Sequence, residues 1–276
     1  MEIHSKLNIA VIPGNPGIKE YYNEFVDKLE SELKSKHMKC DISVNCHKGH
    51  EDKLHEKNYS LIDQIIHHEQ FVTELIQPEK KLILIGHSIG SYIILKLLQN
   101  PYINKNVSKV FLLFPTFERL AETPQGRKFC SWNFRVVKWF LWISIIILVN
   151  FTPHQMKQKI IRWYLGNEIH PGAIKATSIL ISSAVLQQVF FMGQTEMELV
   201  KECEWDIIKE NHKKIFFYYG RNDHWCPESY FHDIRTRFIS ERLPVENEIL
   251  DEHNMQHAFV LSDSSKMAEI LAPLIL

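Results

Sequence analysis

Short apolar runs alternate with longer amphipathic segments along most of this chain. We expect the runs to form buried strands at residues 7–12, 41–45, 81–85, 110–114, 215–219 and 246–250. Apolar residues recur at helical spacing over residues 18–33 and 61–76, and a further helix is expected over 91–99. Continuously apolar strands that alternate with helices are typical of a parallel sheet covered on both faces. The pattern therefore predicts an α/β fold with a mostly parallel sheet.

One long stretch interrupts this alternation. Between Pro115 and about Glu210 the pattern contains no convincing strand, only helical or irregular segments. About ninety residues are too many for a simple connection between two core strands. We therefore expect a core formed by residues 1–115 and 211–276, and an inserted helical cap over residues 116–210.

The expected cap contains the most hydrophobic segment of the chain, at about residues 132–151. Its continuous apolar run is shorter than the ~20 residues that a membrane-spanning helix needs. Basic residues flank it on both sides, an arrangement that suits insertion into a lipid monolayer. The candidate anchor residues are Trp139, Phe140, Leu141, Trp142, Ile145, Ile146 and Ile147. The alternative is a buried cap helix that packs against the core.

Composition excludes several classes of protein. The chain has 276 residues, of which 45% are hydrophobic and 24% charged, so it is neither disordered nor of low complexity. Its net charge of −1 provides no basic field for nucleic acid. The five cysteines include no CxxC pair, and a secreted disulfide framework is not expected. The first residues lack the pattern of a signal peptide.

The most specific motif lies directly after the strand expected at residues 81–85. It reads Gly86-His87-Ser88-Ile89-Gly90 and is followed by a helical segment. A GxSxG motif between a strand and a helix is typical of a nucleophile elbow, in which a strained turn exposes the serine hydroxyl. The two glycines let the strand and the helix approach each other closely. The alternative is an ordinary serine in a strand-to-helix loop.

A serine nucleophile needs a base and a carboxylate that orients the base. In this fold the chain order is serine, acid, histidine. Asp223 follows the strand expected at 215–219, and His257 follows the one expected at 246–250. Both lie where the carboxyl ends of parallel strands meet. His253 and His224 remain alternatives for the base, and Asp251 is a second carboxylate.

The loop after the first strand is the expected source of one oxyanion donor. It reads Pro13-Gly14-Asn15-Pro16-Gly17, and we expect the main-chain N–H groups of Asn15 and Ile89 to form the oxyanion hole. A plain turn is the alternative for this loop. The chain has no GxGxxG and no GxxxxGK[ST] motif, which excludes the common nucleotide-binding loops.

Histidines are frequent in this chain, but they predict neither a metal nor a cofactor. His47, His50 and His55 lie near Cys46, yet their spacing fits no standard set of zinc ligands. His67 and His68 fall on the polar side of the helix expected at 61–76, where we expect them to be solvated.

Several of these segments together resemble the lipid droplet-associated hydrolase family of α/β-hydrolases. They are PGNPG, LILIGHSIGSY, LLFPTFERL, YYGRNDHWCP and HAF. The resemblance implies an α/β-hydrolase core, and it implies residence on lipid droplets and on the cytosolic face of the endoplasmic reticulum membrane. It places the nucleophile, acid and base on Ser88, Asp223 and His257. It associates the chain with hydrolysis of neutral-lipid esters, cholesteryl esters in particular.

The resemblance and the residues together predict a serine ester hydrolase that acts at a lipid surface without a cofactor. Two other functions stay open: a droplet-surface protein whose core is mostly a scaffold, and a thioesterase or acyltransferase with the same triad. Family members usually carry extra N-terminal strands. Since this chain reaches its PGNPG loop at residue 13, we expect those strands to be missing.

Overall fold

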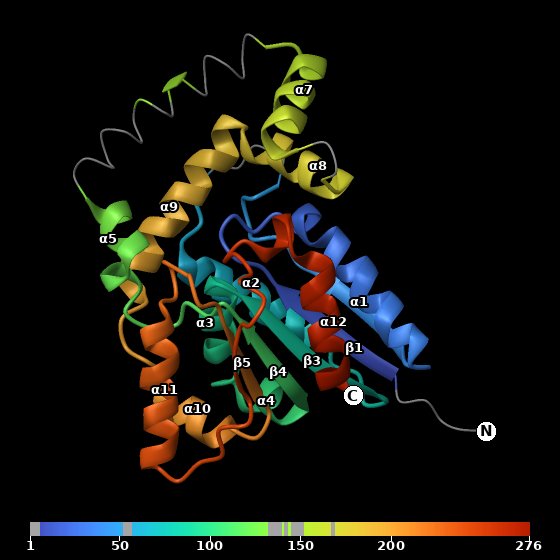
Figure 1. Cartoon of the computed structure of the whole chain (residues 1–276), viewed down its shortest axis with the longest axis vertical. Coiled ribbons are helices and arrows are strands. Elements are labelled where there is room, and N and C mark those ends of the chain that lie inside the picture. The colour runs from blue at the N-terminus through green and yellow to red at the C-terminus, as the bar shows by residue number, and fades with distance from the viewer. Residues whose placement is uncertain (1–5, 52–56, 132–139, 141–142, 145–151, 167–168) are drawn as a thin grey trace.

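Six parallel strands form one sheet at the centre of the protein (Figure 1). We describe them in a computed structural model, which covers residues 6–51, 57–131, 140, 143–144, 152–166 and 169–276. The strands are β1 (Lys6–Ile12), β2 (Lys39–Val44), β3 (Lys80–His87), β4 (Val107–Leu113), β5 (Ile215–Tyr219) and β6 (Glu248–Leu250). Their order is β2-β1-β3-β4-β5-β6, and every neighbouring pair is parallel. The predicted parallel α/β sheet is confirmed.

The last strand is shorter than the apolar pattern predicts. Glu248 N–H donates to the carbonyl of Val245 in a turn, so the ladder begins two residues late. At the other end, the Asp251 carboxylate accepts hydrogen bonds from the main-chain N–H groups of His253 and Met255. These bonds turn the chain away from the sheet directly after Leu250.

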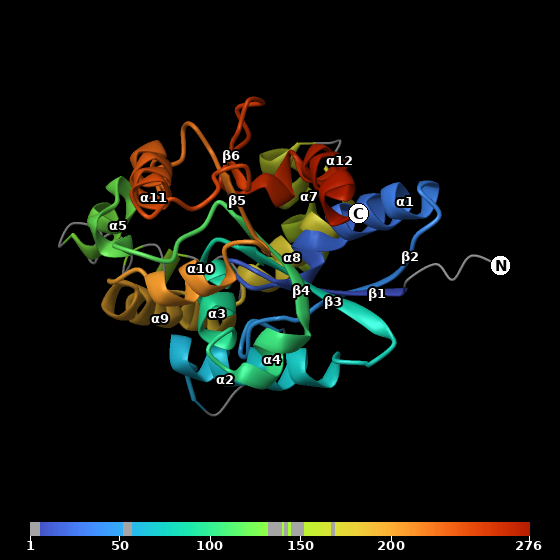
Figure 2. The same cartoon turned by 90° about the horizontal axis from the view of Figure 1, so that it is seen from below.

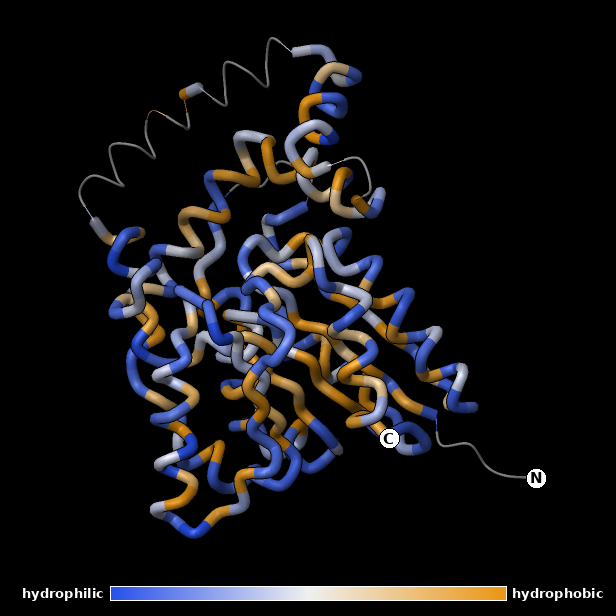
Figure 3. The backbone as a smooth tube through the Cα atoms, viewed as in Figure 1, coloured by the Kyte–Doolittle hydropathy of each residue, from blue (hydrophilic) through white to orange (hydrophobic). Residues whose placement is uncertain are grey.

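Helices cover both faces of the sheet (Figure 2). One face packs against α1 (Asn23–Ser35) and α12 (Ser264–Ile275). The other packs against α2 (Leu61–Glu74), α3 (Ile89–Leu97), α10 (Trp205–Asn211) and α11 (Glu228–Ser240). Successive strand residues point to opposite faces: Ile9 and Val11 of β1 belong to the first core, and Ala10 to the second. Burial on both faces accounts for the continuous apolar strands, which stand out in Figure 3.

The chain between β4 and β5 forms no strand in the residues that the structure describes. Its helices are η2 (Leu120–Glu122), α5 (Pro124–Cys130), α7 (His154–Leu165), α8 (Pro171–Leu180) and α9 (Ser183–Leu199), before α10. The remaining elements are η1 (Lys19–Tyr22), α4 (Pro101–Asn106) and η3 (Phe259–Leu261). Gln188 attaches α9 to the core by two hydrogen bonds with the main chain of Tyr59, at 2.6 and 2.7 Å. Thr195 adds a third, from the N–H of Leu61.

Most of the expected anchor segment lies outside the described residues. Trp139, Leu141, Trp142, Ile145, Ile146 and Ile147 are among those not described. Phe140 is described, and its side chain is 59% exposed. Among the described helices, none alone has the length and hydropathy to cross a membrane; α8 and α9 pass that test only as a pair, bent by 84°.

Two glycines allow β1, β3 and α3 to pack at very short range. A Cβ atom at Gly90 would lie 2.2 Å from the carbonyl oxygen of Ile12 in β1. A Cβ atom at Gly86 would lie 2.8 Å from the main chain of Gly90. Both distances are shorter than any tolerated contact, and the opposing atoms belong to the main chain. Side chains are therefore excluded at both positions.

We predict that Gly90→Ala destabilises the protein by about 2–3 kcal/mol, because the new methyl group forces α3 away from β1. The measurement is urea unfolding of purified protein. Ser91→Ala is the matched control, since it adds no atom and removes one hydrogen bond, to the Gly86 carbonyl, worth about 1 kcal/mol. Equal midpoints for the two variants would contradict the steric argument.

A cluster of histidines is buried between α2 and the loop after β2. His47 Nδ1 lies 2.8 Å from His68 Nε2, and His50 Nδ1 accepts a hydrogen bond from the N–H of Gly17. The expectation that His67 and His68 are solvated is wrong, because the loop folds against α2: His68 is fully buried and His67 is half-buried. No group suited to a metal ion occurs in the described parts of the chain.

Burial disfavours the charged form of these imidazoles, lowering the pKa of His68 to about 3 and that of His47 well below its usual value. Below about pH 6.5 the unfolded chain therefore binds protons that the folded protein does not bind. We predict that the melting temperature falls as the pH drops from 7 to 5, each such histidine costing about 2 kcal/mol at pH 5. His68→Gln should reduce this fall, and an unchanged slope would show that His68 does not contribute.

Candidate active site

Ser88 occupies the single residue between β3 and α3. Its backbone angles are φ 54° and ψ −121°, a region that residues other than glycine rarely adopt. The turn is held because Ser88 N–H donates to the carbonyl of Leu113 in β4, at 2.9 Å. The strained turn lies at the carboxyl end of the sheet, where the neighbouring loops reach the Ser88 hydroxyl.

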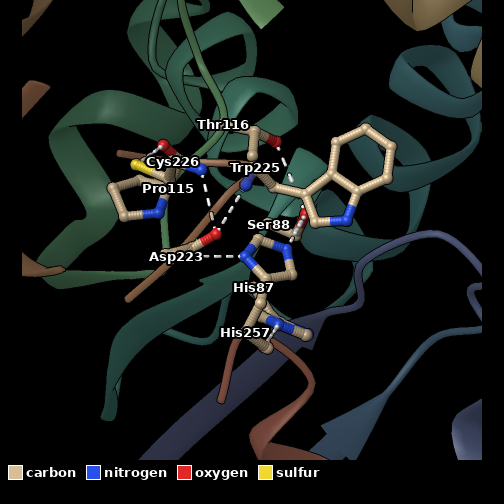
Figure 4. Close-up of polar contacts among 8 residues, drawn as sticks. All are labelled: His87, Ser88, Pro115, Thr116, Asp223, Trp225, Cys226 and His257. Atoms are coloured by element: carbon tan, nitrogen blue, oxygen red, sulfur yellow. Dashed lines mark hydrogen bonds and ion pairs between the residues drawn. The ribbon is translucent and has the colours of Figure 1, made fainter. Parts of the chain in front are cut away.

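Three side chains form a continuous line of hydrogen bonds at this turn (Figure 4). His257 Nε2 lies 2.9 Å from Ser88 Oγ, and His257 Nδ1 lies 2.6 Å from Asp223 Oδ2. Ser88 follows β3, Asp223 follows β5 and His257 follows β6. The carboxyl ends of three parallel strands thus bring together residues that are far apart in the sequence.

The surroundings of Asp223 determine how it meets the imidazole. Asp223 is 5% exposed, and its Oδ1 accepts hydrogen bonds from the main-chain N–H groups of Trp225 and Cys226, at 2.7 and 3.0 Å. Oδ2 is then directed at His257. A carboxylate at Nδ1 favours the tautomer with its proton on that nitrogen, which leaves the lone pair of Nε2 facing the Ser88 hydroxyl.

The residues considered as alternatives for the base and the acid lie elsewhere and do not join this line of hydrogen bonds. His253 and His224 are exposed, whereas the imidazole that hydrogen-bonds to Ser88 Oγ is that of His257. Asp251 is fully buried, and it binds the Tyr218 hydroxyl at 2.6 Å in addition to two main-chain N–H groups. Asp251 therefore shapes the loop that carries His257, whereas Asp223 contacts the imidazole itself.

The loop after β1 runs against the Ser88 turn. A Cβ atom at Gly14 would lie 3.0 Å from the Cβ atom of Ser88. The N–H of Gly14 donates to the Tyr22 hydroxyl and that of Gly17 donates to His50, while the two prolines have no N–H. Asn15 is thus the loop residue whose main-chain N–H stays a candidate oxyanion donor. Ile89 is the first residue of α3, where main-chain N–H groups have no partner within the helix.

His87 connects this loop to the one that carries His257. Its Nδ1 lies 2.7 Å from the Tyr22 hydroxyl and its Nε2 lies 2.8 Å from the carbonyl oxygen of His257. Burial lowers the pKa of His87 to about 3, so the ring is neutral. Nε2–H then donates to the carbonyl, and Nδ1 accepts the Tyr22 proton. Tyr22 in turn accepts the N–H of Gly14. One neutral imidazole therefore ties together both loops beside Ser88.

A cavity of about 260 Å³ opens onto Ser88 and His257. Most of its other walls are apolar: Leu120, Phe129, Val189, Phe190, Met197 and Trp225. Asn15, Thr116 and Glu196 add polar groups, and the Thr116 hydroxyl lies 3.5 Å from Ser88 Oγ. Sequence reasoning missed Tyr22, Thr116 and Glu196. Thr116, three residues after the end of β4, is the one that its position near a strand end could have indicated.

Comparison with known proteins places the chain in a family. Its sequence matches the family described as lipid-droplet associated hydrolase over residues 5–260. It is 35% identical to the lipid droplet-associated hydrolase of Homo sapiens, over 97% of this chain and 84% of that protein. For the Drosophila melanogaster protein of the same name the identity is 31%, over 99% of this chain and 90% of that protein.

The fold recurs in solved structures. The peroxisomal alpha-beta-hydrolase Lpx1 of Saccharomyces cerevisiae superimposes with a TM-score of 0.64 at 16% identity, covering 98% of this chain and 76% of that one. The α/β-hydrolase fold that the resemblance implied is thus confirmed, and the chain belongs to the lipid droplet-associated hydrolase family.

Proposed function

We propose that this chain is a serine hydrolase of hydrophobic carboxylic esters. The observation that supports this most directly is the line of hydrogen bonds from Ser88 through His257 to Asp223. Ser88 is the nucleophile, His257 is the general base and Asp223 orients the imidazole and stabilises its charged form. None of these roles requires a cofactor.

The reaction runs through an acyl-enzyme. Ser88 Oγ attacks the ester carbonyl carbon while its proton moves to His257 Nε2, and the carbonyl oxygen becomes an oxyanion between the N–H groups of Asn15 and Ile89. The tetrahedral intermediate collapses, and the alcohol leaves with the proton from His257. Water then attacks the acyl carbonyl in the same way and releases the carboxylic acid and free Ser88.

The substrate class follows from the walls of the cavity and from the relatives. The side chains around Ser88 are mostly apolar, so the cavity suits an acyl chain or another hydrophobic group next to the ester. Relatives at 31–35% identity are named for their association with lipid droplets. We therefore assign esters of neutral lipids as the substrates, cholesteryl esters included.

Fluorophosphonate labelling tests the nucleophile. We predict that wild-type protein is labelled and that Ser88→Ala is not, since the probe reacts only with an activated serine. Asp223→Asn should slow labelling by several orders of magnitude, because it removes the charge that stabilises the imidazolium. His253→Ala should label like wild type. Ser91→Ala, a buried serine in the same turn, is the control for folding.

Labelling that persists in Ser88→Ala would refute the assignment. A panel of p-nitrophenyl esters, acyl-CoA thioesters and sterol esters then distinguishes an ester hydrolase from a thioesterase. An active-site serine that reacts with the probe but turns over none of these substrates would favour the scaffold function.

We also propose that residues 116–210 form a cap that docks on a lipid surface, either the droplet monolayer or the cytosolic face of the endoplasmic reticulum. Among the described residues, α7 supports this, and it lies at the edge of the molecule far from the sheet (Figure 1). Met156, Ile160, Trp163 and Tyr164 are spaced i, i+4, i+7 and i+8, so they share one side of the helix. They are 55%, 42%, 83% and 79% exposed.

The charge on α7 favours a lipid partner over a protein. Lys157, Lys159 and Arg162 lie on the same helix, which contains no acidic residue. Exposed Trp and Tyr side chains beside cations are typical of helices that lie at a membrane surface, where rings enter the headgroup region and cations meet phosphates. Lysine is depleted in protein interfaces. Ile161, beside this exposed side, is buried, and α7 packs against α8.

Two sets of substitutions test the docking. We predict that replacing Ile145, Ile146 and Ile147 with Ser, or Met156 and Trp163 with Ser, releases the protein from droplets, because less apolar surface enters the lipid. The measurement is the droplet-bound fraction by fluorescence microscopy. Ile62→Ser/Ile66→Ser is the matched control, since both isoleucines are about half-exposed on α2. Unchanged localisation of both test variants would refute the proposal.

A further inference from the structure

Glu196 is a buried carboxyl group that the proposed reaction does not use. It belongs to the last turn but one of α9 and is 6% exposed. It lines the same cavity as Ser88 and His257. Its Oε1 accepts a hydrogen bond of 2.9 Å from the side-chain amide of Asn15, which also donates to the carbonyl of Val189 at 3.0 Å. Two groups of α9 therefore hold the residue proposed as an oxyanion donor.

No charged partner compensates Glu196. It forms no ion pair in the described part of the chain. The elements packed against α9 carry these titratable residues: Asp63, His67, His68, Glu69 and Glu74 on α2, Glu122 on η2, Arg127, Lys128 and Cys130 on α5, and Lys175 on α8. His257 lies across the cavity. Burial raises the pKa of the Glu196 carboxyl to about 8, and the hydrogen bond from Asn15 is a smaller, opposing influence. At neutral pH the group is therefore protonated.

We propose that Glu196 is a positioning residue that works as an uncharged carboxylic acid: it holds Asn15 beside Ser88 and keeps negative charge away from the oxyanion side of the cavity. The inference rests on the proposed serine hydrolase function. In this proposal α9 does more than form a wall of the cavity, because its residue Glu196 positions Asn15 for the reaction.

The physical reason is the charge that develops during acyl transfer. The oxyanion forms between the main-chain N–H groups of Asn15 and Ile89, and Glu196 is one hydrogen bond from the Asn15 side chain. A carboxylate so close to a developing oxyanion repels it, and the repulsion is strong in a cavity that excludes water. A neutral carboxyl accepts the same amide hydrogen without this cost. Ionisation of Glu196 therefore slows attack by Ser88.

The rate of fluorophosphonate labelling against pH tests this without knowledge of the natural substrate. For wild type we expect the second-order rate to fall by about tenfold between pH 7 and 9.5, with a midpoint near pH 8. For Glu196→Gln, relative to its own rate at pH 7, we expect no fall, because an amide accepts the Asn15 hydrogen and does not ionise. Glu196→Ala should label more slowly than Glu196→Gln at every pH, since it no longer holds Asn15.

Glu248 provides the matched control. It is also a buried carboxyl group, with its pKa raised by burial to about 7, but it lies in β6 and does not line the cavity. Glu248→Gln should therefore retain the alkaline fall of wild type. The proposal is overturned if wild type shows no fall, if Glu196→Gln shows the same fall as wild type, or if Glu196→Ala labels as fast as wild type at pH 7, where the wild-type carboxyl is neutral.

Thermal unfolding is a second readout that does not involve Ser88. Between about pH 4.5 and 8 the folded protein keeps a proton on Glu196 that the unfolded chain has lost, so the contribution of this one group to stability falls as the pH rises, opposite in sign to that of the buried histidines. As the pH rises through this range, the melting temperature of Glu196→Gln minus that of wild type should therefore increase. If the difference in melting temperature between Glu196→Gln and wild type stays constant with pH, the proposal of a neutral Glu196 carboxyl is overturned. Labelling of Ser88→Ala would instead overturn the proposed hydrolase function, so the two failures are distinguishable.

Discussion

The close contact between β1 and the start of α3 decides where Ser88 and the loop of Asn15 lie. Gly90 meets the carbonyl of Ile12 with no room for a side chain, so α3 begins directly against the end of β1. The loop that carries Asn15 leaves β1 at this point, and Ser88 is the residue before α3. The N-terminus of a helix and a glycine-containing loop therefore lie beside the cavity onto which Ser88 opens.

Hydrogen bonds between buried neutral groups hold the loops of this arrangement in place. His87 joins the Tyr22 hydroxyl to the carbonyl of His257, and Tyr22 holds the loop at Gly14. Because the imidazole is uncharged, it can donate at one nitrogen and accept at the other, which a protonated ring cannot do. Residues from η1, the end of β3 and the loop after β6 thus share one fully paired polar network, and such networks specify a single geometry.

What the sequence could predict depended on how local each signal was. The six strands and the turn at Ser88 were predictable because apolar runs and a GxSxG motif are patterns of neighbouring residues. Asp223 and His257 could be proposed because each follows a predicted strand, in the chain order serine, acid, histidine. Glu196 was not predictable, since its partner Asn15 lies 181 residues away and nothing in the helical pattern of α9 marks it. The burial of His68 depends likewise on a loop that packs against α2 only in the folded chain.

The separation of Ser88 and His257 along the chain has a consequence for synthesis. The two side chains are 169 residues apart, and His257 lies close to the C-terminus. While the ribosome is still making β4, β5 and the intervening helices, the serine emerges with no imidazole to activate it. In the proposed reaction, a polypeptide that stops before His257 therefore lacks the general base that activates Ser88. Labelling of Ser88 would thus report that the chain has been made through β6 and has folded.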